Sequence, residues 1–292
     1  MRRPSASTTS LVCALAFGGC EARECYATIV YGSEAKHACL AAVLGASLRV
    51  VDPARPRVAL VSNVSGSALE ALGEAFEVAR TRWRGAPGRK VDLFAGPLGC
   101  DRLVYMDADC VPTARPQSVR ALWAQLRASP TSVVATRQGR VWENYKHDEG
   151  CFNGGFLAVR RDPGIRERYV KYTKTFTRQR GAWSKVDPRQ RIGTKSIPCH
   201  GTDQGFLNLA VGPKWTVANF SVHFATTCRA AAADVVHAGR GGLAALLARA
   251  PPRAGGGDPP RHDGDWCGLW WGAFATLSDT TRALCAAALR PP

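Results

Sequence analysis

Residues 103–111 read LVYMDADCV, and the expected architecture follows from this segment. Apolar residues typical of a buried strand run directly into two aspartates that are one residue apart. Residues i and i+2 of an extended segment point the same way, so Asp107 and Asp109 should aim both carboxylates at one place beyond the strand. A hard divalent cation is the simplest group that offsets their repulsion. The alternative is a solvated turn, where aspartate is common.

The segments before residue 103 alternate between strand-like and helix-like patterns. Residues 25–31 and 57–61 are rich in β-branched and aliphatic residues, which predicts buried strands. Residues 35–49 carry an apolar stripe with helical spacing, and residues 67–80 are expected to form a second helix capped by Ser67. This alternation predicts a parallel sheet covered by helices, an α/β fold. Ligands of such sheets bind at the carboxyl ends of the strands.

Length, composition and charge narrow the class of protein. The chain has 292 residues, 46% of them hydrophobic, which suits one large α/β domain or two smaller ones. Its 39 Lys and Arg against 23 Asp and Glu give a net charge of +16, which favours an anionic partner such as a nucleotide. No basic stripe interleaved with aromatics and no helix-turn-helix or zinc-finger spacing is present, so nucleic acid is not an expected partner.

The two ends of the chain differ from its middle. Residues 1–22 combine early arginines, a short apolar run and small residues, which predicts either a secretory signal or a disordered tail. That run is too short to span a bilayer and no other stretch is apolar enough, so no transmembrane span is expected. Residues 251–292 form a Pro/Gly linker and a Trp-rich tail that either packs on the domain or contacts a partner.

The cysteines and two glycosylation sequons bear on the compartment. There are 11 cysteines with no C-x-x-C pair, a count that suits several disulfides and leaves one cysteine over. The sequons begin at Asn63 and Asn219. These features allow a secretory route, for example to the Golgi, and a cytoplasmic location is also compatible with the sequence.

Three later segments contain residues suited to a binding site. Residues 151–155, CFNGG, place an asparagine and two glycines before an apolar strand, which indicates close approach of the backbone to a ligand or a tight turn. Residues 201–208, GTDQGFLN, begin a helix with Asp203 in its first turn, where simple capping is the alternative. Residues 235–239, VVHAG, form a short strand that ends in His237.

These segments, in this order, resemble glycosyltransferase family 8, which includes glycogenin and galactinol synthase. The resemblance covers roughly residues 25–242. Residues 105–109 are similar to the family's metal-binding motif, residues 151–155 to its sugar-binding segment, and residues 201–208 to its Asp-Gln-x-x-Leu-Asn helix start. Residues 235–239 are similar to its late His-containing strand. Lys90, with Phe94 four residues on, is similar to the family's Lys-x-x-x-aromatic segment.

The resemblance implies a fold and an activity. The fold would be of GT-A type, a Rossmann-like mixed but mostly parallel sheet flanked by helices, in a single domain over residues 25–250. The activity would be retaining transfer of a hexose from a UDP-sugar, with Mn²⁺ as cofactor and Mg²⁺ as the alternative. The acceptor would be a carbohydrate, a glycoprotein or a small polyol, and neither the acceptor nor the donor sugar can be identified from the sequence.

The resemblance also implies roles for individual residues. Mn²⁺ would be held by Asp107, Asp109 and His237. Residues expected to contact the sugar or its phosphates are Lys90, Asn153, Gly154, Gly155, Asp203, Gln204, Gly239 and Arg240. Of these, Asp203 and Gln204 are the catalytic candidates, because retention needs either same-face attack or a covalent intermediate on a nearby side chain. Uracil and ribose would bind at the end of the first strand, at Thr28, Val30 and Tyr31.

The chain departs from the family pattern in its late motif. Gly239 follows His237 after one residue, where the family has two, and the family's Lys-Pro-Trp is missing. Arg240 could replace the charge of that lysine. One alternative is therefore a catalytically weakened nucleotide-sugar-binding protein. Another is a nucleotidyltransferase, against which the lack of a Gly-rich basic loop after the first strand argues.

Overall fold

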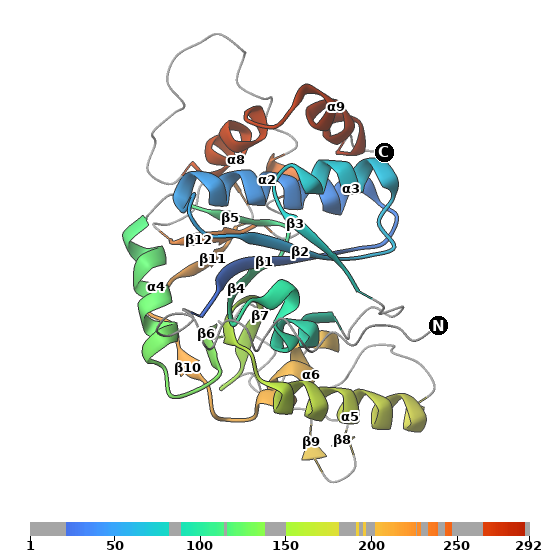
Figure 1. Ribbon diagram of the computed structural model, residues 1–292, viewed down its shortest axis with the longest axis vertical. Helices are drawn as coiled ribbons and strands as arrows, with labels where there is room; N and C mark the ends of the chain where they lie inside the picture. The colour runs from blue at the N-terminus through green and yellow to red at the C-terminus, as the bar shows by residue number, and fades with distance from the viewer. Residues whose placement is uncertain are drawn as a thin grey trace, which may run out of the picture.

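The structure of the chain is a computed structural model, which describes most of residues 22–289. The described residues are 22–81, 89–113, 116–137, 150–180, 191–192, 195–196, 202–225, 227–228, 233–238, 243–246 and 265–289. Within them, a seven-stranded sheet lies between two layers of helices, and two further helices lie outside one of those layers (Figure 1). Residues 1–21 and 247–264 lie outside the described residues, so the signal or tail and the linker stay predictions.

The seven-stranded sheet is mixed and mostly parallel. Its order is β10-β6-β7-β4-β1-β2-β3. The strands are β1 (Glu24–Tyr31), β2 (Arg57–Ser62), β3 (Glu77–Arg80), β4 (Arg102–Met106), β6 (Val133–Arg137), β7 (Phe152–Arg160) and β10 (Thr216–Val217). Strand β7 runs antiparallel to β4 and β6, and the other neighbours are parallel. The predicted fold class, a Rossmann-like sheet flanked by helices in a single domain, is confirmed.

Each face of this sheet is covered by its own group of helices. One face packs against α2 (Ala35–Val51), α3 (Gly66–Gly73) and α4 (Pro116–Ala128). The other packs against η1 (Arg89–Ala95), α5 (Pro163–Arg180) and α6 (Thr202–Val211), and η2 (Pro97–Gly99) follows η1. Strand β7 is buried along almost its whole length. A strand covered on both faces is expected to be apolar on both, and residues 156–159 of β7 form such a run.

Two smaller sheets complete the described strands. Strand β12 (Val235–His237) lies between β11 (Val222–Phe224) and β5 (Cys110–Pro112), parallel to the first and antiparallel to the second. Strands β8 (Arg191–Ile192) and β9 (Lys195–Ser196) pair with each other as a two-stranded antiparallel sheet. The three-stranded sheet lies next to the Asp107–Asp109 segment, because β5 directly follows that segment.

The described part of the C-terminal tail packs on the domain. Helices α8 (Trp266–Ala275) and α9 (Asp279–Ala288) lie against the side of α2 that faces away from the large sheet (Figure 1). Disulfides Cys39–Cys285 and Cys228–Cys267 tie both helices to the rest of the chain. The start of α9 is also hydrogen-bonded to Glu74, the residue that directly follows α3. The Glu74 carboxylate accepts hydrogen bonds from Ser278 and Thr281.

One predicted helix is shorter than the sequence indicates. The helix expected over residues 67–80 ends at Gly73, and residues 77–80 form edge strand β3, so the prediction for its second half is wrong. Its N-cap is Ser65 rather than Ser67, with no side-chain capping bond. The physical reason is tertiary: Val78 pairs with Ala59 of β2, and Phe76 packs against Gly45, where an added Cβ would lie 2.4 Å from the ring. Long-range pairing overrides the helical spacing.

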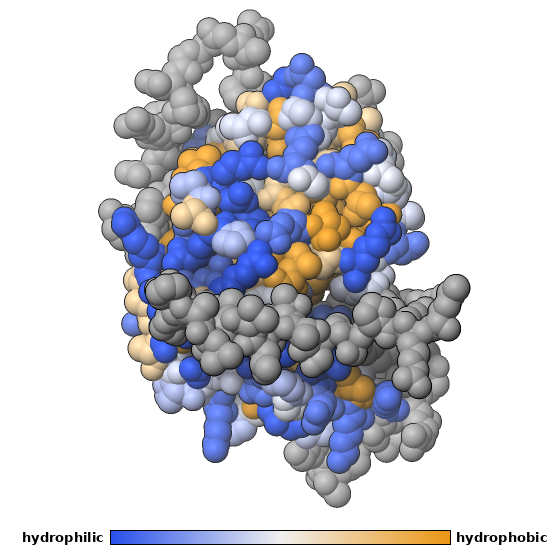
Figure 2. All heavy atoms as spheres, viewed as in Figure 1, coloured by the Kyte–Doolittle hydropathy of each residue, from blue (hydrophilic) through white to orange (hydrophobic). Residues whose placement is uncertain are grey.

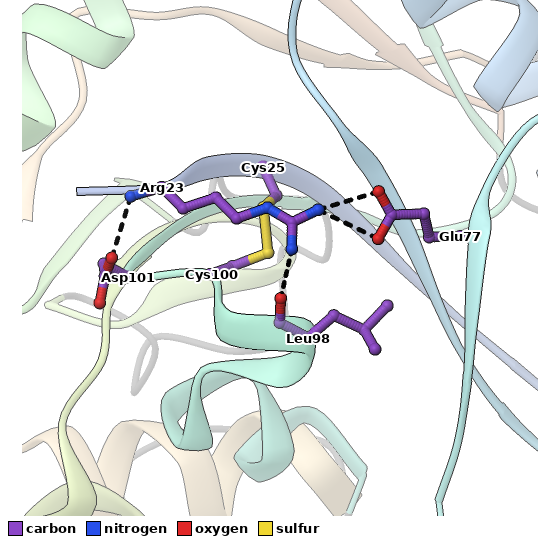
Figure 3. Close-up of a disulfide and its surroundings, with 6 residues drawn as sticks. All are labelled: Arg23, Cys25, Glu77, Leu98, Cys100 and Asp101. Carbon is purple, nitrogen blue, oxygen red and sulfur yellow. Dashed lines mark hydrogen bonds and ion pairs between the residues drawn. A yellow bond between two sulfur atoms is a disulfide. The ribbon is translucent and has the colours of Figure 1, made fainter. Parts of the chain in front are cut away.

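The edge of the sheet where β1 begins is fixed by a disulfide and a charged cluster. Cys25 at the start of β1 is bonded to Cys100 just before β4 (Figure 3). Beside it the Arg23 guanidinium binds both carboxylate oxygens of Glu77 at 2.8 and 3.0 Å, and the Arg23 N–H donates to Asp101 (Figure 3). This is the edge opposite the one where Asp107 follows β4, so it supports the fold without touching the candidate site.

Figure 2 shows the polarity of one face of the molecule. In Figure 2 hydrophilic residues cover most of the visible described surface, and a smaller group of hydrophobic residues gathers over α3 and edge strand β3. Among the described helices, none combines the length and apolar composition that crossing a bilayer requires.

A second charged cluster sits at the same edge, around Glu24. The Glu24 side chain is only 12% exposed and accepts hydrogen bonds from Arg55 at 3.1 Å and Arg127 at 2.6 Å, with Arg102 at 3.7 Å. Burial by itself would raise the pKa of Glu24, but the guanidinium hydrogen bonds and charges outweigh it and lower that pKa. Because folding lowers the pKa of Glu24, the ionised Glu24 carboxylate stabilises the folded state at a pH above its unfolded-state pKa. This stabilisation is lost as the pH falls through the folded-state pKa of Glu24.

We therefore expect Glu24→Gln to lower the free energy of unfolding at pH 7 by about 1.5–3 kcal/mol, the usual size for hydrogen bonds to charged groups. The deficit should shrink at a pH below the folded-state pKa, where the wild-type carboxyl is itself neutral. Urea unfolding at both pH values measures it, with exposed Glu70→Gln on α3 as the matched control. An equal deficit at both pH values would show that charge is not the cause.

Candidate functional site

The candidate site lies at the end of β4, where the chain leaves the large sheet. Strand β4 ends at Met106, and residues 107–109 form a turn in which Cys110 N–H donates to the Asp107 carbonyl at 3.0 Å. Asp107 and Asp109 are therefore not two positions of one extended strand, and that part of the prediction is wrong. The turn, not strand alternation, directs both carboxylates to the same histidine.

His237 reaches both aspartates from β12. Its Nε2 atom lies 3.0 Å from Asp109 Oδ1 and 3.9 Å from Asp107 Oδ2. The approach is set by backbone pairing: His237 is opposite Cys110 in the β12–β5 ladder, and Ala238 N–H donates to the Asp109 carbonyl at 3.0 Å. The three residues that the sequence suggested as metal ligands thus lie together in the structure.

The Asp109–His237 pair is largely shielded from solvent, and its two pKa values move apart. Burial opposes charge on both groups, so by itself it would raise the pKa of Asp109 and lower that of His237. The hydrogen bond and the attraction between them outweigh burial, and the net result is a lowered pKa for Asp109 and a raised pKa for His237. A cation on His237 Nε2 would have to displace a proton, because only the neutral imidazole is a ligand.

A lysine and a tyrosine hold the other side of Asp107. Lys90 Nζ lies 3.2 Å from Asp107 Oδ1 and donates to the Gly154 carbonyl at 2.8 Å. The Tyr105 hydroxyl donates to the same Asp107 oxygen, and Lys90 Nζ lies 5.2 Å from the Tyr105 ring centroid. Tyr105 is buried and was not singled out as a site residue. Its position two residues before Asp107 in the β4 strand was the available signal, since such residues share a face.

The glycines of β7 bring its backbone against the carboxylates. Gly155 O accepts from Asp107 N–H at 2.9 Å, and Gly155 N–H donates to Asn153 Oδ1 at 2.7 Å. A Cβ added to Gly155 would lie 2.8 Å from Asp107 Oδ2 and 2.8 Å from His237 Cε1. Real Cβ atoms essentially never come that close, so only glycine leaves the space between Asp107 and His237 open.

Gln204 and Lys90 border the neighbouring glycine. Gly154 N–H donates to Gln204 Oε1 at 3.0 Å. A Cβ added to Gly154 would lie 3.6 Å from both Gln204 Oε1 and Lys90 Nζ, which is ordinary van der Waals contact. Helix α6 carries Gln204 and is itself anchored to β7 by Asn208, which exchanges hydrogen bonds with Phe152 N–H and the Phe152 carbonyl. The predicted sugar-contacting segments therefore meet at one place.

The donor atoms of the site fit a hard divalent cation. Two carboxylates and an imidazole supply oxygen and nitrogen, and two ligand atoms each about 2.1 Å from one ion lie about 3 Å apart when adjacent. The hydrogen-bonded atoms His237 Nε2 and Asp109 Oδ1 are 3.0 Å apart, which equals this value, and Asp107 Oδ2 is farther from His237 Nε2, at 3.9 Å. Cys110 Sγ also lies within 4.8 Å of the ligand atoms of Asp109 and His237. Burial, reinforced by the charges of Asp109 and Asp107, raises the pKa of Cys110, which keeps it a neutral thiol.

The remaining predicted site residues differ in whether their side chains are exposed. Thr28 is fully buried and its hydroxyl donates to the Met106 carbonyl at 2.9 Å, and Val30 is also buried in the core. Tyr31 is 45% exposed at the end of β1 and stacks on His37 of α2, so it alone of the three presents its side chain. Asp203 belongs to α6, but its side chain lies outside the described residues, as do Gly239 and Arg240.

The fold of this chain is similar to that of solved structures. No protein-family model and no curated protein sequence matches the chain. Among solved structures, the galactosyltransferase LgtC in complex with donor and acceptor sugar analogs matches with a TM-score of 0.52 and 13% identity over 91% of this chain and 97% of that one. An active-site mutant of LgtC gives 0.55 and 13% over 87% and 96%.

A third similar structure is larger. The WbbM bifunctional glycosyltransferase in its apo form matches with a TM-score of 0.50 and 11% identity, over 88% of this chain and 50% of that one. At these identities the likeness establishes the fold. The chain has the GT-A α/β fold found in these glycosyltransferases.

Proposed function

We propose that this protein is a retaining hexosyltransferase of the glycosyltransferase family 8 type, which uses a UDP-sugar donor and depends on Mn²⁺. The observation that carries the proposal is the meeting of Asp107, Asp109 and His237 at the end of β4. These residues come from two segments far apart in the sequence, one with both aspartates and one with His237, and each segment resembles that family. The GT-A fold, shared with a galactosyltransferase solved with donor and acceptor sugar analogs, supports the same conclusion.

The residues of the site divide into two groups by charge. Asp107, Asp109 and His237 would hold the cation, and when bound it supplies positive charge that stabilises the diphosphate leaving group. Lys90 adds a second positive charge beside Asp107, at 3.2 Å. The diphosphate is therefore expected to bind at the cation, within reach of the Lys90 ammonium.

The donor sugar is expected to lie beside Gly154, where the backbone leaves room. Gln204 is fixed there by the 3.0 Å hydrogen bond from Gly154 N–H, and Asn153 is fixed by its 2.7 Å hydrogen bond from Gly155 N–H. These residues orient the hexose, whose anomeric carbon becomes oxocarbenium-like as the sugar–phosphate bond breaks. Same-face attack by the acceptor and a covalent intermediate on Asp203 or Gln204 are both compatible with retention.

The nucleoside would bind at the exposed end of β1. Tyr31, stacked on His37 with ring centroids 6.2 Å apart, offers an aromatic face at the carboxyl edge of the sheet. Thr28 would contribute by fixing the backbone of β4 just before Asp107, through its 2.9 Å hydrogen bond to the Met106 carbonyl, rather than by touching the ligand.

A donor screen tests the proposed function. UDP-sugars are incubated with the protein and Mn²⁺, and released UDP is measured with and without candidate acceptors. UDP with Mn²⁺ should also raise thermal stability, by about 2.7 kcal/mol at a ligand concentration one hundred times its dissociation constant. Stabilisation without hydrolysis or transfer would favour a nucleotide-sugar-binding protein, for which the missing Lys-Pro-Trp is the argument. No stabilisation by any nucleoside diphosphate with Mn²⁺ would contradict the proposal.

We further propose that the protein acts in the secretory pathway, with a catalytic domain over residues 25–250 and a disulfide-linked tail. Six described cysteines form three disulfides, Cys151 is also disulfide-bonded, and such bonds persist in oxidising compartments. Asn63 and Asn219, the two sequon asparagines, are exposed. A mobility shift on enzymatic deglycosylation of the protein expressed in eukaryotic cells would support this route. Reduced cysteines in protein purified under alkylating conditions would contradict it.

A further inference from the structure

The two faces of strand β12 belong to different parts of the molecule. Val235 and His237 share one face, on which Val235 packs in the core beside the large sheet and His237 meets Asp109. Val236 and Ala238 are on the other face, with 1% and 3% of their surface exposed, and they pack in a separate cluster with α8 and α2. The strand that carries His237 is therefore backed by a cluster that includes residues of the C-terminal tail.

Strand β5 has the same arrangement. Cys110 faces the site, whereas Val111 packs in the cluster that contains Val236. In the β12–β5 ladder His237 is opposite Cys110, and Val236 is opposite Val111. One wall of packed side chains thus backs both the strand that follows Asp109 and the strand that carries His237.

Helix α8 contributes the aromatic part of this wall and is anchored next to β12. Trp266 is 1% exposed within the cluster, and its Nε1 donates to the Thr227 carbonyl at 2.7 Å. The neighbouring residue Cys267 is disulfide-bonded to Cys228. Thr227 and Cys228 follow β11 in the chain, and β11 pairs with β12. The hydrogen bond and the disulfide therefore attach α8 beside the strand that bears His237.

We propose that α8, through Trp266 and the Cys228–Cys267 disulfide, positions His237 for cation binding. The inference rests on the proposed function only in that the site binds a divalent cation. Neither Trp266 nor the disulfide touches the cation or the substrate, so they act through the strands that they support. Groups that orient a metal ligand commonly change metal affinity by about 10–100-fold when they are removed.

The experiment compares the removal of two disulfides. The double variant Cys228→Ser/Cys267→Ser should bind Mn²⁺ about tenfold more weakly than the wild type, by calorimetry or by the electron paramagnetic resonance signal of free Mn²⁺. The matched control Cys25→Ser/Cys100→Ser removes the disulfide at the opposite edge of the sheet (Figure 3) and should change Mn²⁺ affinity by less than about twofold. No donor or acceptor is needed for either measurement.

A second comparison tests whether the effect passes through His237. In a His237→Ala background, removing the Cys228–Cys267 disulfide should not weaken Mn²⁺ binding further, because the residue that it positions is already missing. A tenfold loss in that background, as in the wild type, would overturn the proposal even though the affinity falls, since the disulfide would then act on the site by another route.

A milder variant covers the case in which the double variant does not fold. Trp266→Phe keeps the disulfide and most of the apolar volume but removes the donor to Thr227, and circular dichroism reports whether each protein is folded. It should weaken Mn²⁺ binding several-fold with no further effect in the His237→Ala background. Wild-type affinity in both folded variants would overturn this inference alone, whereas failure of the wild type to bind Mn²⁺ would overturn the proposed cation site as well.

Discussion

Asp109→Ala should abolish measurable UDP-sugar hydrolysis and remove Mn²⁺ binding. The Asp109 carboxylate lies nearer to His237 Nε2 than the Asp107 carboxylate does, at 3.0 Å against 3.9 Å, and without it Asp107 and His237 are the remaining proposed ligands. A cation that stabilises a leaving group contributes several kcal/mol, so the rate of donor hydrolysis should fall by about 10³-fold, roughly 4 kcal/mol. Calorimetry with Mn²⁺ and an assay of UDP release measure the two effects.

Two controls separate charge from folding in that experiment. Asp109→Asn keeps the shape and one oxygen but removes the negative charge, and should lose most of the Mn²⁺ affinity too. Asp101→Asn alters an aspartate at the opposite edge of the sheet, where it accepts a hydrogen bond from Arg23 N–H, and should leave hydrolysis within about twofold. Normal Mn²⁺ affinity in Asp109→Ala would show that the aspartates and His237 do not form the cation site.

Gly155→Ala is expected to block the cation site by adding a single methyl group. That methyl would lie 2.8 Å from both Asp107 Oδ2 and His237 Cε1, and 3.0 Å from Asn153 Oδ1. The backbone cannot retreat easily, because Gly155 O accepts from Asp107 N–H at 2.9 Å and β7 is paired on both sides. We expect Mn²⁺ affinity to fall by about 100-fold, with an overpacking cost in stability of about 1–3 kcal/mol.

The adjacent glycine provides the matched control. A Cβ on Gly154 would meet Gln204 and Lys90 at 3.5–3.6 Å, which the structure can accommodate. Gly154→Ala should therefore leave Mn²⁺ affinity within about threefold, although it narrows the proposed sugar site and should raise KM for the donor. If Gly155→Ala bound Mn²⁺ as the wild type does, the space between Asp107 and His237 would not be where the cation sits.

The layered α/β fold could be predicted from the sequence because its signals are local. The apolar strand ending at Met106 and the first strand are continuous buried runs, as their sequences predict. The helix after the first strand is present as predicted, but it is buried on nearly every side and not only along a stripe, because α8 and α9 cover its outer side. The prediction failed where a distant partner decides the conformation. Residues 77–80 have helical spacing in sequence, but pairing with β2 makes them a strand.

The site shows the same division between local and distant information. The motif residues Asp107, Asp109 and His237 could be chosen from the sequence, and a turn at the aspartates was the stated alternative to an extended strand. That this turn brings both carboxylates to His237 could not be predicted, because it depends on β5 pairing with β12. Tyr105 was missed because a tyrosine within an apolar strand is typical of the core. Its spacing of two residues from Asp107 indicated a shared face, and the structure shows that its hydroxyl reaches Asp107. Thr28 is the opposite case: it was predicted to contact the ligand, but its hydroxyl donates a hydrogen bond to the Met106 carbonyl inside the core.

The Cys39–Cys285 disulfide joins positions that are 246 residues apart. During translation, Cys39 on α2 must wait with its thiol uncovered until the ribosome has passed residue 285, whereas Cys25 and Cys100 can pair much earlier. For most of synthesis the outer side of α2 therefore has no cover, and the nascent chain presents both an apolar helix surface and a reactive thiol to chaperones and oxidoreductases. Folding of this protein should therefore depend on chaperones and oxidoreductases until α9 has been synthesised.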